Sequence, residues 1–319
     1  MQEKKNFDIL TTGELLVDFI GEKLGEDLEE SARFGKYQGG SPANLAANIA
    51  KLGGRSAVVA TVGDDGFGRF LIRELDKCNV YTGYITKHPV LPTSIIMIAK
   101  TLRAPVFTPY RYADNEIDVT HFPDFLLRQC KVFHTTAFGL SKLPAQESIL
   151  LAGARAHKFG AVLSIDLNYA TQVFPEIEKT RDVLRRYFQY SPLVKLSGDD
   201  AARLYGKDAE NPRRVIKKLI NQGARLVCYT DGAAGNYIAT PEMEEAAFFP
   251  AARIEVKDTT GAGDAFWSGF LHAWIKGKDL PGCQQLAEAV VLYKLTHGGP
   301  LPNQLDVDKL LDEHNTFQP

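Results

Sequence analysis

This sequence is poor in the features that mark secreted, membrane-bound or metal-binding proteins. It has 4 cysteines in 319 residues, and they lie far apart, without the paired spacing of a zinc site or a redox motif. No apolar run approaches the roughly 20 residues of a transmembrane helix, and the apolar stretch after residue 6 is too short for the core of a signal peptide. We therefore expect reduced thiols, no membrane partner and a cytoplasmic location.

An excess of charge of one sign is also missing. The net charge is −2 and the isoelectric point is about 6.4, so no global basic field would attract nucleic acid or an anionic membrane. Apolar residues, in contrast, make up 45% of the chain, which is enough to bury the core of one large α/β domain or of two smaller ones. This balance is typical of an enzyme that acts on a small molecule.

The order of the predicted elements indicates the fold class. A strand at 56–62 precedes a helix at 70–77, and strands at 131–135, 161–168, 193–196 and 226–230 alternate with helical patterns. This alternation predicts a mostly parallel central sheet with helices on both faces. Strand-like runs at 15–20, 93–100 and 106–112 break the rhythm and predict a small separate sheet. We expect a single domain, 1–319, with a β lid contributed by about 14–38 and 92–115.

The chain is organised around residues 258–264, Asp-Thr-Thr-Gly-Ala-Gly-Asp. This stretch follows a β-like run at 252–256 and leads into an apolar helical pattern, so its two glycines lie where a strand turns into a helix. Glycines let a phosphate approach the backbone, and the unpaired N–H groups and dipole of a new helix favour an anion. Asp264 would lie beside that anion and accept a proton from an attacking hydroxyl. The pattern indicates phosphoryl transfer to an alcohol.

A second helix is predicted at 41–52, because the residues at both of its ends are typical of helix termini. Ser41 is a suitable N-cap, and Gly39 and Gly40 before it permit the close approach of a polar ligand. Asn44, in the first turn, reaches towards the same space on this interpretation. The alternative is that Asn44 is an ordinary polar residue of a first helical turn.

Polar residues near the ends of the predicted strands complete the candidate site. Asp18 lies in an apolar run, where a carboxylate is costly unless it is paired or faces a ligand; the alternative is an Asp that caps a turn. Ligands of parallel sheets bind beyond the carboxyl ends of the strands. We therefore expect one cleft there, lined by the loop 258–264 and by Asp166, Asn168, Ser197, Thr230 and Gly232.

Four segments together resemble the PfkB, or ribokinase-like, family of carbohydrate kinases, and they follow the family's order over nearly the whole chain. Residues 13–19 are similar to the opening motif of its fructokinase and 2-keto-3-deoxygluconate kinase branch, and 39–44 resemble its sugar-binding di-glycine segment. Residues 63–68 resemble its N-terminal signature and 258–264 its ATP-side signature. A Gly-Ala-Gly turn alone also suits a plain strand–helix connection, but such a connection does not require Asp264. The resemblance implies a ribokinase-like fold with a small β lid over the sugar.

The resemblance also implies roles for individual residues. Asp264 would be the catalytic base, and Gly261, Ala262 and Gly263 would form the anion hole. The sugar would be bound by Asp18, Gly39, Gly40 and Asn44. ATP would be bound by Asn168, Ser197, Asp200, Thr230, Gly232, Gly235, Gly261 and Gly263, with Mg²⁺ bridging its phosphates. Asp258 and Thr260 would help bind a monovalent cation, K⁺.

Three departures from the family's pattern stand out. The Asn-x-x-Glu segment, linked to magnesium and phosphate handling, is replaced by residues 197–200, Ser-Gly-Asp-Asp, and Ala170 stands where the branch usually has Arg. Residues 110–114 resemble the Tyr-Arg-x-x-Ala-Asp pattern of fructokinases with one residue fewer. There Arg111 would bind a sugar hydroxyl or a substrate carboxylate, or else it is a solvated lid arginine.

The sequence therefore predicts an ATP-dependent sugar kinase that phosphorylates a primary hydroxyl, with fructose as the first choice of substrate. A 2-keto-3-deoxygluconate kinase is the second choice, and a ribokinase or nucleoside kinase comes after it. A non-catalytic, sugar-responsive regulatory protein is a remote alternative, raised by Ala170 and the changed segment 197–200. The expected partners are the sugar, ATP and, because lid strands leave exposed edges, a second copy of the chain in a homodimer.

Overall fold

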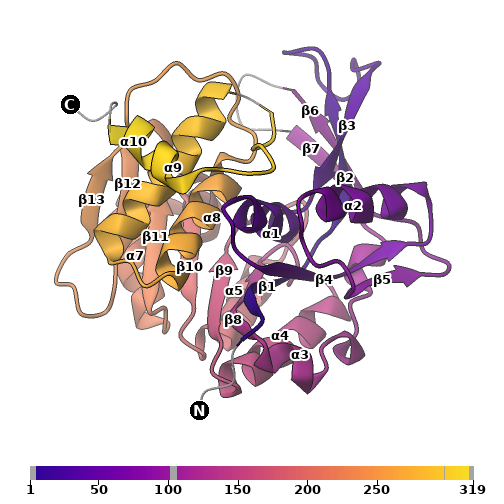
Figure 1. The fold of residues 1–319 in the computed structure, drawn as a ribbon, viewed down its shortest axis with the longest axis horizontal. Coiled ribbons are helices and arrows are strands. Elements are labelled where there is room, and N and C mark those ends of the chain that lie inside the picture. Colours follow the sequence, from indigo (N-terminus) through magenta and orange to yellow (C-terminus); the bar gives the residue numbers. More distant parts are fainter. Residues whose placement is uncertain (1–4, 101–105, 298, 316–319) are drawn as a thin grey trace.

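The computed structural model describes residues 5–100, 106–297 and 299–315. Within them the chain forms one sheet of nine strands and one of four, and helices surround the larger sheet (Figure 1). The helices are α1 (Ser41–Lys51), α2 (Gly66–Lys77), α3 (Asp124–Arg128), α4 (Ala145–Lys158), α5 (Ile177–Phe188), α6 (Gly198–Tyr205), α7 (Pro212–Asn221), α8 (Ala262–Ile275), α9 (Leu280–His297) and α10 (Val307–Asn315).

The large sheet is parallel over most of its width. Its spatial order is β13 (Ala247–Pro250), β12 (Gly235–Ala239), β11 (Leu226–Thr230), β10 (Leu193–Ser197), β9 (Val162–Asp166), β8 (Cys130–Thr136), β1 (Phe7–Thr12), β4 (Ser56–Gly63) and β5 (Ile85–His88). Neighbours from β11 to β5 pair in parallel, while β12 and β13 add antiparallel strands at one edge. The carboxyl ends of the parallel strands therefore lie along one edge of the sheet.

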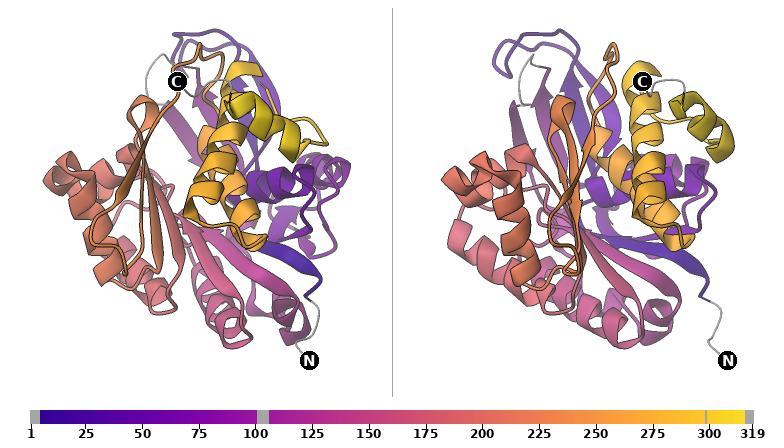
Figure 2. Two further views of the ribbon diagram at one scale, coloured as in Figure 1. Left: turned by 60° about the vertical axis from the view of Figure 1, so that its left-hand side comes forward. Right: turned by 90° about the vertical axis from the view of Figure 1, so that its left-hand side faces the viewer.

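Side-chain alternation along the strands explains why helices cover both faces. Ile9 and Val132 belong to a hydrophobic cluster with residues of α1, α8 and α9. Their neighbours Leu10 and Phe133 belong to a second cluster with residues of α4, α5 and α7. Figure 2 shows the two helical layers on opposite sides of the sheet. The predicted α/β fold class is confirmed.

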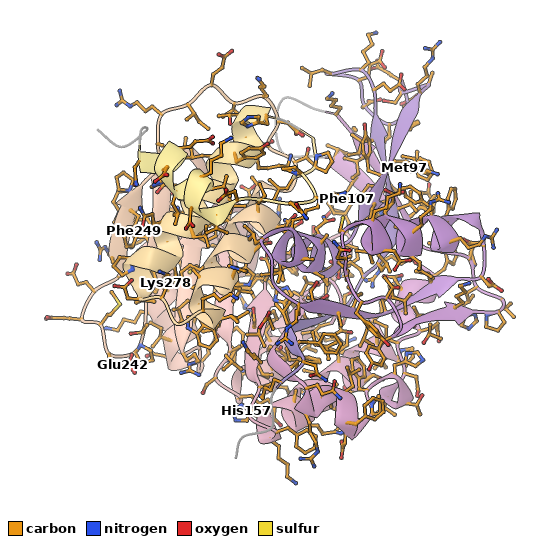
Figure 3. All side chains as sticks on the ribbon, viewed as in Figure 1. Met97, Phe107, His157, Glu242, Phe249 and Lys278 are labelled. Carbon is orange, nitrogen blue, oxygen red and sulfur yellow. The ribbon has the colours of Figure 1, made fainter. Side chains whose placement is uncertain are left out.

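The small sheet has the order β3 (Phe34–Gly39), β2 (Leu16–Gly21), β6 (Ile95–Ala99) and β7 (Val106–Tyr110). Figure 3 locates it through the labelled side chains of Met97 on β6 and Phe107 on β7. Val17 packs towards α1 and α2, whereas Leu16 packs on the other face against Phe138 and Val173, which follow strands of the large sheet. Asp18 shares the face of Leu16, because alternate residues of a strand point the same way.

One predicted strand is wrong. Residues 252–256 are irregular, and the chain reaches α8 from the antiparallel strand β13 through a connection without regular structure. Alternating apolar residues were the only signal for a strand there. All of residues 251–256 are partly or fully exposed, so this alternation does not reflect a buried face.

Candidate active site

Helix α8 carries the predicted anion hole at its N-terminus. Its N-cap, Gly261, has a φ of 74°, in the left-handed region that favours glycine. The Ala262 N–H donates to Thr259 O at 3.1 Å, so that amide is committed within the loop. Gly263 and Asp264 follow in the first turn, where N–H groups lack the acceptor four residues earlier that a continuing helix provides. This helix end has the polarity that attracts an anion.

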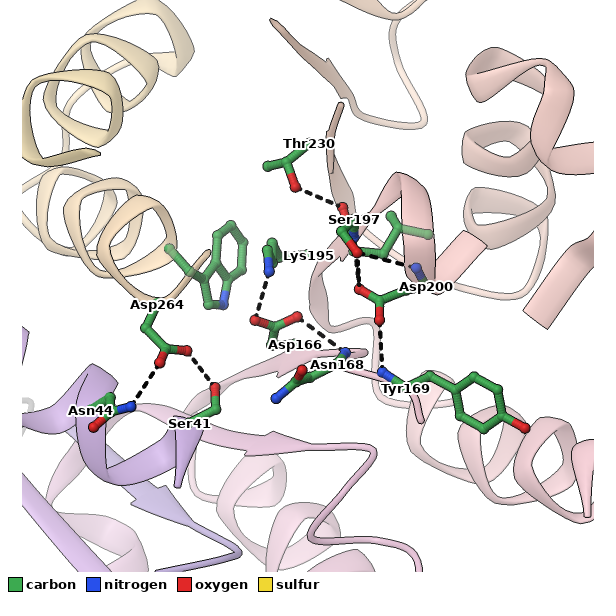
Figure 4. Close-up of polar contacts among 12 residues, drawn as sticks. Ser41, Asn44, Asp166, Asn168, Tyr169, Lys195, Ser197, Asp200, Thr230 and Asp264 are labelled. Atoms are coloured by element: carbon green, nitrogen blue, oxygen red, sulfur yellow. Dashed lines mark hydrogen bonds and ion pairs between the residues drawn. The ribbon is translucent and has the colours of Figure 1, made fainter. Parts of the chain in front are cut away.

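The Asp264 carboxylate is held by two side chains of helix α1 (Figure 4). Ser41 Oγ donates to Oδ1 at 2.6 Å, and Asn44 Nδ2 donates to Oδ2 at 2.9 Å. Gln38 Nε2 in turn donates to Asn44 Oδ1 at 2.7 Å, which directs the Asn44 NH₂ group at the carboxylate. The structure therefore brings together Asp264 and Asn44 from opposite ends of the chain.

The environment of Asp264 favours a proton acceptor. Burial raises the pKa of Asp264 above its ordinary value, although the hydrogen bonds from Ser41 and Asn44 and the charge of Lys195 oppose that rise. A raised pKa makes a carboxylate a better base while its partners keep the ionised form accessible. This balance suits a group that must accept a proton near neutral pH.

The role of Ser41 differs from the N-cap that the sequence predicted. Gly40 is the N-cap of α1 and Ser41 is its first helical residue, so the Ser41 hydroxyl is free to reach Asp264. The backbone N–H of Ser41 donates instead to Glu14 Oε1 at 3.3 Å. The cap is thus supplied by a distant carboxylate, which leaves the serine side chain for the site.

Asp18 lies on the face of the small sheet that is turned towards the large sheet. Burial raises the pKa of Asp18 to about 7, and repulsion from the charge of Asp264 adds to this. A Cβ on Gly39 would lie 2.5 Å from both Asp18 carboxylate oxygens, so this glycine makes room for the carboxylate. Gly40 has a φ of 97°, and a Cβ there would meet Glu14 O at 2.2 Å. The di-glycine segment therefore allows both the Asp18 position and the turn into α1.

Glu14 is a buried residue that sequence reasoning did not select. Its Oε2 accepts a hydrogen bond from Thr136 Oγ1 at 2.7 Å, and its Oε1 accepts the one from Ser41 N. Burial raises the pKa of Glu14 to about 8, against the opposing effect of Thr136. Glu14 thus joins the start of the small sheet to β8 and α1. A charged residue between the two apolar runs that form β1 and β2 was the available signal.

Lys195, on β10, is the second residue that sequence reasoning missed. Its Nζ forms a buried ion pair of 2.9 Å with Asp166 Oδ2. A Cβ on Gly263 would lie 2.8 Å from the same Nζ, so the ammonium lies directly beside the first turn of α8. Burial disfavours this charge, but attraction to Asp166, Asp200 and Asp264 outweighs burial and raises the pKa of Lys195. A lysine within an apolar strand was the signal, because such a charge requires a partner.

Of the residues predicted for ATP, Asn168, Ser197, Asp200 and Thr230 lie at or just beyond the carboxyl ends of β9, β10 and β11 and are labelled in Figure 4. Ser197 and Asp200 form a reciprocal capping box at the start of α6, and Asp200 Oδ1 also accepts from Tyr169 N at 2.8 Å. Thr230 Oγ1 makes a long hydrogen bond of 3.4 Å to Leu196 O. Asn168 has a positive φ of 31°. Both carboxylate oxygens of Asp200 therefore accept backbone hydrogen bonds, Oδ1 from Tyr169 N and Oδ2 from Ser197 N.

The two predicted glycines beyond β11 differ in their surroundings. Gly232 begins a short 3₁₀ turn (Gly232–Ala234), and a Cβ there would meet nothing within 4 Å. Gly235 begins β12 with a φ of 128°, and a Cβ there would lie 2.2 Å from Phe249 O. Space beside Gly232 is thus open, whereas Gly235 is required by strand packing.

Arg111 is neither solvated nor free. Its guanidinium forms an ion pair of 2.6 Å with Asp114 Oδ2, and both side chains are buried. It also donates to Phe138 O at 3.2 Å and to Ser141 Oγ at 2.5 Å, and it lies 4.4 Å from the centre of the Phe138 ring. Arg111 thus ties the end of β7 to the segment after β8. The alternative that Arg111 is a solvated lid arginine is therefore wrong.

Asp258 and Thr260, the predicted cation ligands, lie in the loop before α8. Asp258 Oδ1 accepts from Thr260 N at 2.9 Å, and Asp258 Oδ2 lies 3.3 Å from Lys294 Nζ. Among the described residues, no group of three or more His, Cys, Asp or Glu side chains could hold a metal ion. A cation bound to Asp258 would therefore have to accommodate the nearby Lys294 ammonium.

The fold is shared with solved sugar kinases. The chain is 26% identical to an uncharacterised sugar kinase from Pyrococcus horikoshii that was solved in complex with ATP; the TM-score is 0.82, and the match covers 97% of this chain and 99% of that one. The chain belongs to the pfkB family of carbohydrate kinases, whose model matches residues 6–304. The predicted family is therefore confirmed, and the use of ATP by this kinase has support.

Two curated relatives bear on the substrate. The chain is 34% identical to an ATP-dependent 6-phosphofructokinase of Thermoanaerobacterium thermosaccharolyticum, over 97% of this chain and 94% of the relative. It is 31% identical to a probable fructokinase-5 of Arabidopsis thaliana, over 85% of this chain and 83% of the relative.

None of the helices in the described part of the chain is long and apolar enough to cross a membrane.

Proposed function

We propose that this protein is a fructokinase, which transfers the γ-phosphoryl group of ATP to a primary hydroxyl of fructose. The observation that carries the proposal is the position of Asp264. Its carboxylate lies at the N-terminus of α8, is oriented by Ser41 and Asn44, and is close enough to Asp18 for its charge to raise the pKa of that residue. A base, an anion site and a sugar-binding carboxylate thus meet in one place.

In the proposed reaction, Asp264 accepts the proton of the attacking hydroxyl. A bond forms between that oxygen and the γ-phosphorus, while the bond from the γ-phosphorus to the oxygen that links it to the β-phosphate breaks and releases ADP. The amides at Gly261 and Gly263 stabilise charge on the transferred group. Lys195 positions the anion hole, because its buried ammonium lies beside Gly263 in the first turn of α8.

Magnesium would enter with the nucleotide. Mg²⁺ is usually held by substrate phosphates, water and one or two carboxylates rather than by a protein cage. The carboxylates at the ATP edge are Asp166 and Asp200, and each has lone pairs left beside its present partners, Lys195 for Asp166 and backbone N–H groups for Asp200; they would hold the ion together with the phosphates and water. When bound, the ion would neutralise charge on the phosphates.

The surroundings of Asp18 favour a neutral sugar. Leu16, Ile96, Phe138 and Val173 form an apolar cluster between the two sheets, and Ala170 packs against it. A keto acid would require a cation for its carboxylate, but the guanidinium of Arg111 is already paired with Asp114. This argues against the 2-keto-3-deoxygluconate alternative.

Fructose 6-phosphate is the second candidate acceptor. The specific observation in its favour is the 34% identity to a relative named as a 6-phosphofructokinase. Its phosphate would also need a cationic partner, and Arg111 in its present ion pair does not offer one. We therefore place fructose first and include the phosphorylated sugar in the test.

The test is ADP release by purified protein with Mg-ATP and one sugar at a time. The panel contains fructose, fructose 6-phosphate, 2-keto-3-deoxygluconate, ribose, glucose and adenosine, each with an Asp264→Asn control. A kcat/KM highest for fructose supports the proposal. A higher value for another member replaces fructose with that substrate, and no ADP above the control with any of them favours a regulatory protein over a kinase of these sugars.

Three further expectations accompany this function. We propose that residues 1–319 form a single domain, with the small sheet acting as a lid over the sugar. We propose a homodimer formed through the lid, which the exposure of Tyr37, Val106 and Tyr110 on its strands supports; light scattering of the purified protein tests it. A cytoplasmic location fits a consumer of ATP whose four cysteines are unpaired and buried.

A further inference from the structure

Lys294, near the end of α9, is directed at the loop that precedes the anion hole. Its Nζ lies 3.3 Å from Asp258 Oδ2, and its side chain is only 9% exposed. Its Cε lies 3.7 Å from the position of a Cβ on Gly261. The next residue of α9 strengthens this junction, because Leu295 O accepts a hydrogen bond from Lys257 N at 2.8 Å. The end of α9 and the start of the loop are thus fixed together.

The Asp258 carboxylate is engaged on both oxygens. Oδ1 accepts from Thr260 N, and Oδ2 faces the Lys294 ammonium. The counter-ion of the Asp258 carboxylate is thus part of the chain.

This arrangement does not fit the K⁺ ion that the family resemblance implies at Asp258 and Thr260. A cation bound to Asp258 would lie within a few ångströms of the Lys294 ammonium, where two like charges repel strongly in partly buried surroundings. Both oxygens of Asp258 are also engaged already, Oδ1 by the Thr260 N–H and Oδ2 by Lys294.

We propose that the Lys294 ammonium takes the place of the monovalent cation, so that this kinase needs no added K⁺. A lysine ammonium is a compact, strongly hydrated point charge with three donors, and here it neutralises Asp258 and fixes the loop ahead of Gly261. Lys294 is thus a positioning residue for the anion hole. The prediction for turnover rests on the proposed function, but the prediction for the melting temperature does not.

The test compares the wild type with Lys294→Ala and Lys294→Met in potassium chloride and in choline chloride at equal ionic strength. Wild-type turnover should be the same in both salts. Lys294→Ala removes the charge and opens space, so its kcat should fall about 10- to 100-fold in choline chloride, the usual range for outer partners of a charged site, and recover in potassium chloride. Lys294→Met fills the space without charge and should stay slow in both.

Melting temperatures without substrates provide a readout independent of turnover. Potassium chloride, compared with choline chloride, should raise the melting temperature of Lys294→Ala and leave the wild type unchanged. Lys77→Ala, which breaks an exposed pair with Glu74, is the matched control and should respond to neither salt. Activation or stabilisation of the wild type by K⁺ would overturn the proposal, as would a Lys294→Ala enzyme that equals the wild type without K⁺. If no sugar is phosphorylated, the melting data still decide the inference.

Discussion

Asn44 donates a hydrogen bond of 2.9 Å from Nδ2 to Oδ2 of Asp264, a residue 220 positions later in the chain. This bond links the first turns of α1 and α8, so the sugar-side and ATP-side segments share one carboxylate. Donors to the ionised form of an acid lower its pKa. The bond therefore sets both the direction of the carboxylate and its proton affinity.

The acid limb of the pH–rate profile should respond to the other donor, Ser41. Its hydroxyl lowers the pKa of Asp264, which burial holds above the ordinary value. Ser41→Ala removes this opposition, so the pKa rises and the acid limb of kcat moves to higher pH. The measurement is kcat against pH at saturating substrates. Ser31→Ala, in an exposed loop, is the control, and an unmoved limb in Ser41→Ala would argue against Asp264 as the titrating base.

Gly39→Ala should weaken sugar binding more than turnover. The new Cβ would lie 2.5 Å from both Asp18 carboxylate oxygens, which forces Asp18 away from its position. We expect KM for the sugar to rise about tenfold, equivalent to roughly 1.4 kcal/mol, with a smaller change in kcat. Gly66→Ala is the matched control, because a Cβ there approaches only Arg69, at 4.0 Å. Equal behaviour of the two variants would remove Asp18 from the sugar site.

Lys195→Met should lower both stability and turnover, for separable reasons. The change leaves Asp166 buried without its partner, and breaking a buried ion pair in this way typically costs about 3–5 kcal/mol of unfolding free energy. The double change Lys195→Met with Asp166→Leu should recover stability in urea unfolding, while kcat stays low because both charged groups are missing from the ATP edge. If kcat returns together with stability, neither charge is needed for turnover and the pair is structural only.

Glu14 should make stability depend on pH. Its pKa in the folded state is about 8, above the value of 4.5 for an ordinary glutamate, so the folded protein holds this proton more tightly than the unfolded chain does. Its contribution to the free energy of unfolding is therefore largest below pH 4.5 and declines as pH rises towards about 8. Glu14→Gln should flatten this decline in urea unfolding. A variant with the wild-type pH slope would show that Glu14 does not titrate in this range.

Local sequence patterns were sufficient for the fold class and for the backbone of the site. The alternation of strands and helices reflects periodic burial. Gly39, Gly40 and Gly263 mark positions where a Cβ would meet a close neighbour, and Gly261 marks one with a positive φ. Both kinds of feature leave signals within short windows. The strand expected at 252–256 is wrong because alternation alone does not establish burial.

The missing parts are contacts between distant residues. Lys195 with Asp166, Glu14 with Thr136 and Lys294 with Asp258 each join separate elements, and no short window contains both partners. The pair of Arg111 with Asp114 is different, because they lie three positions apart and a local ion pair could have been weighed against a ligand role. Non-local pairing is what the sequence alone did not reveal.

The most direct test of the central claim is the effect of Asp264→Asn on binding and chemistry measured separately. Calorimetry should give a sugar affinity close to that of the wild type, since Asn keeps an oxygen that can accept a hydrogen bond. Single-turnover phosphoryl transfer should fall about 10²- to 10⁴-fold, the usual contribution of a general base. A transfer rate near the wild type, or a loss of sugar affinity as large as the loss of rate, would contradict the assignment of Asp264 as the base.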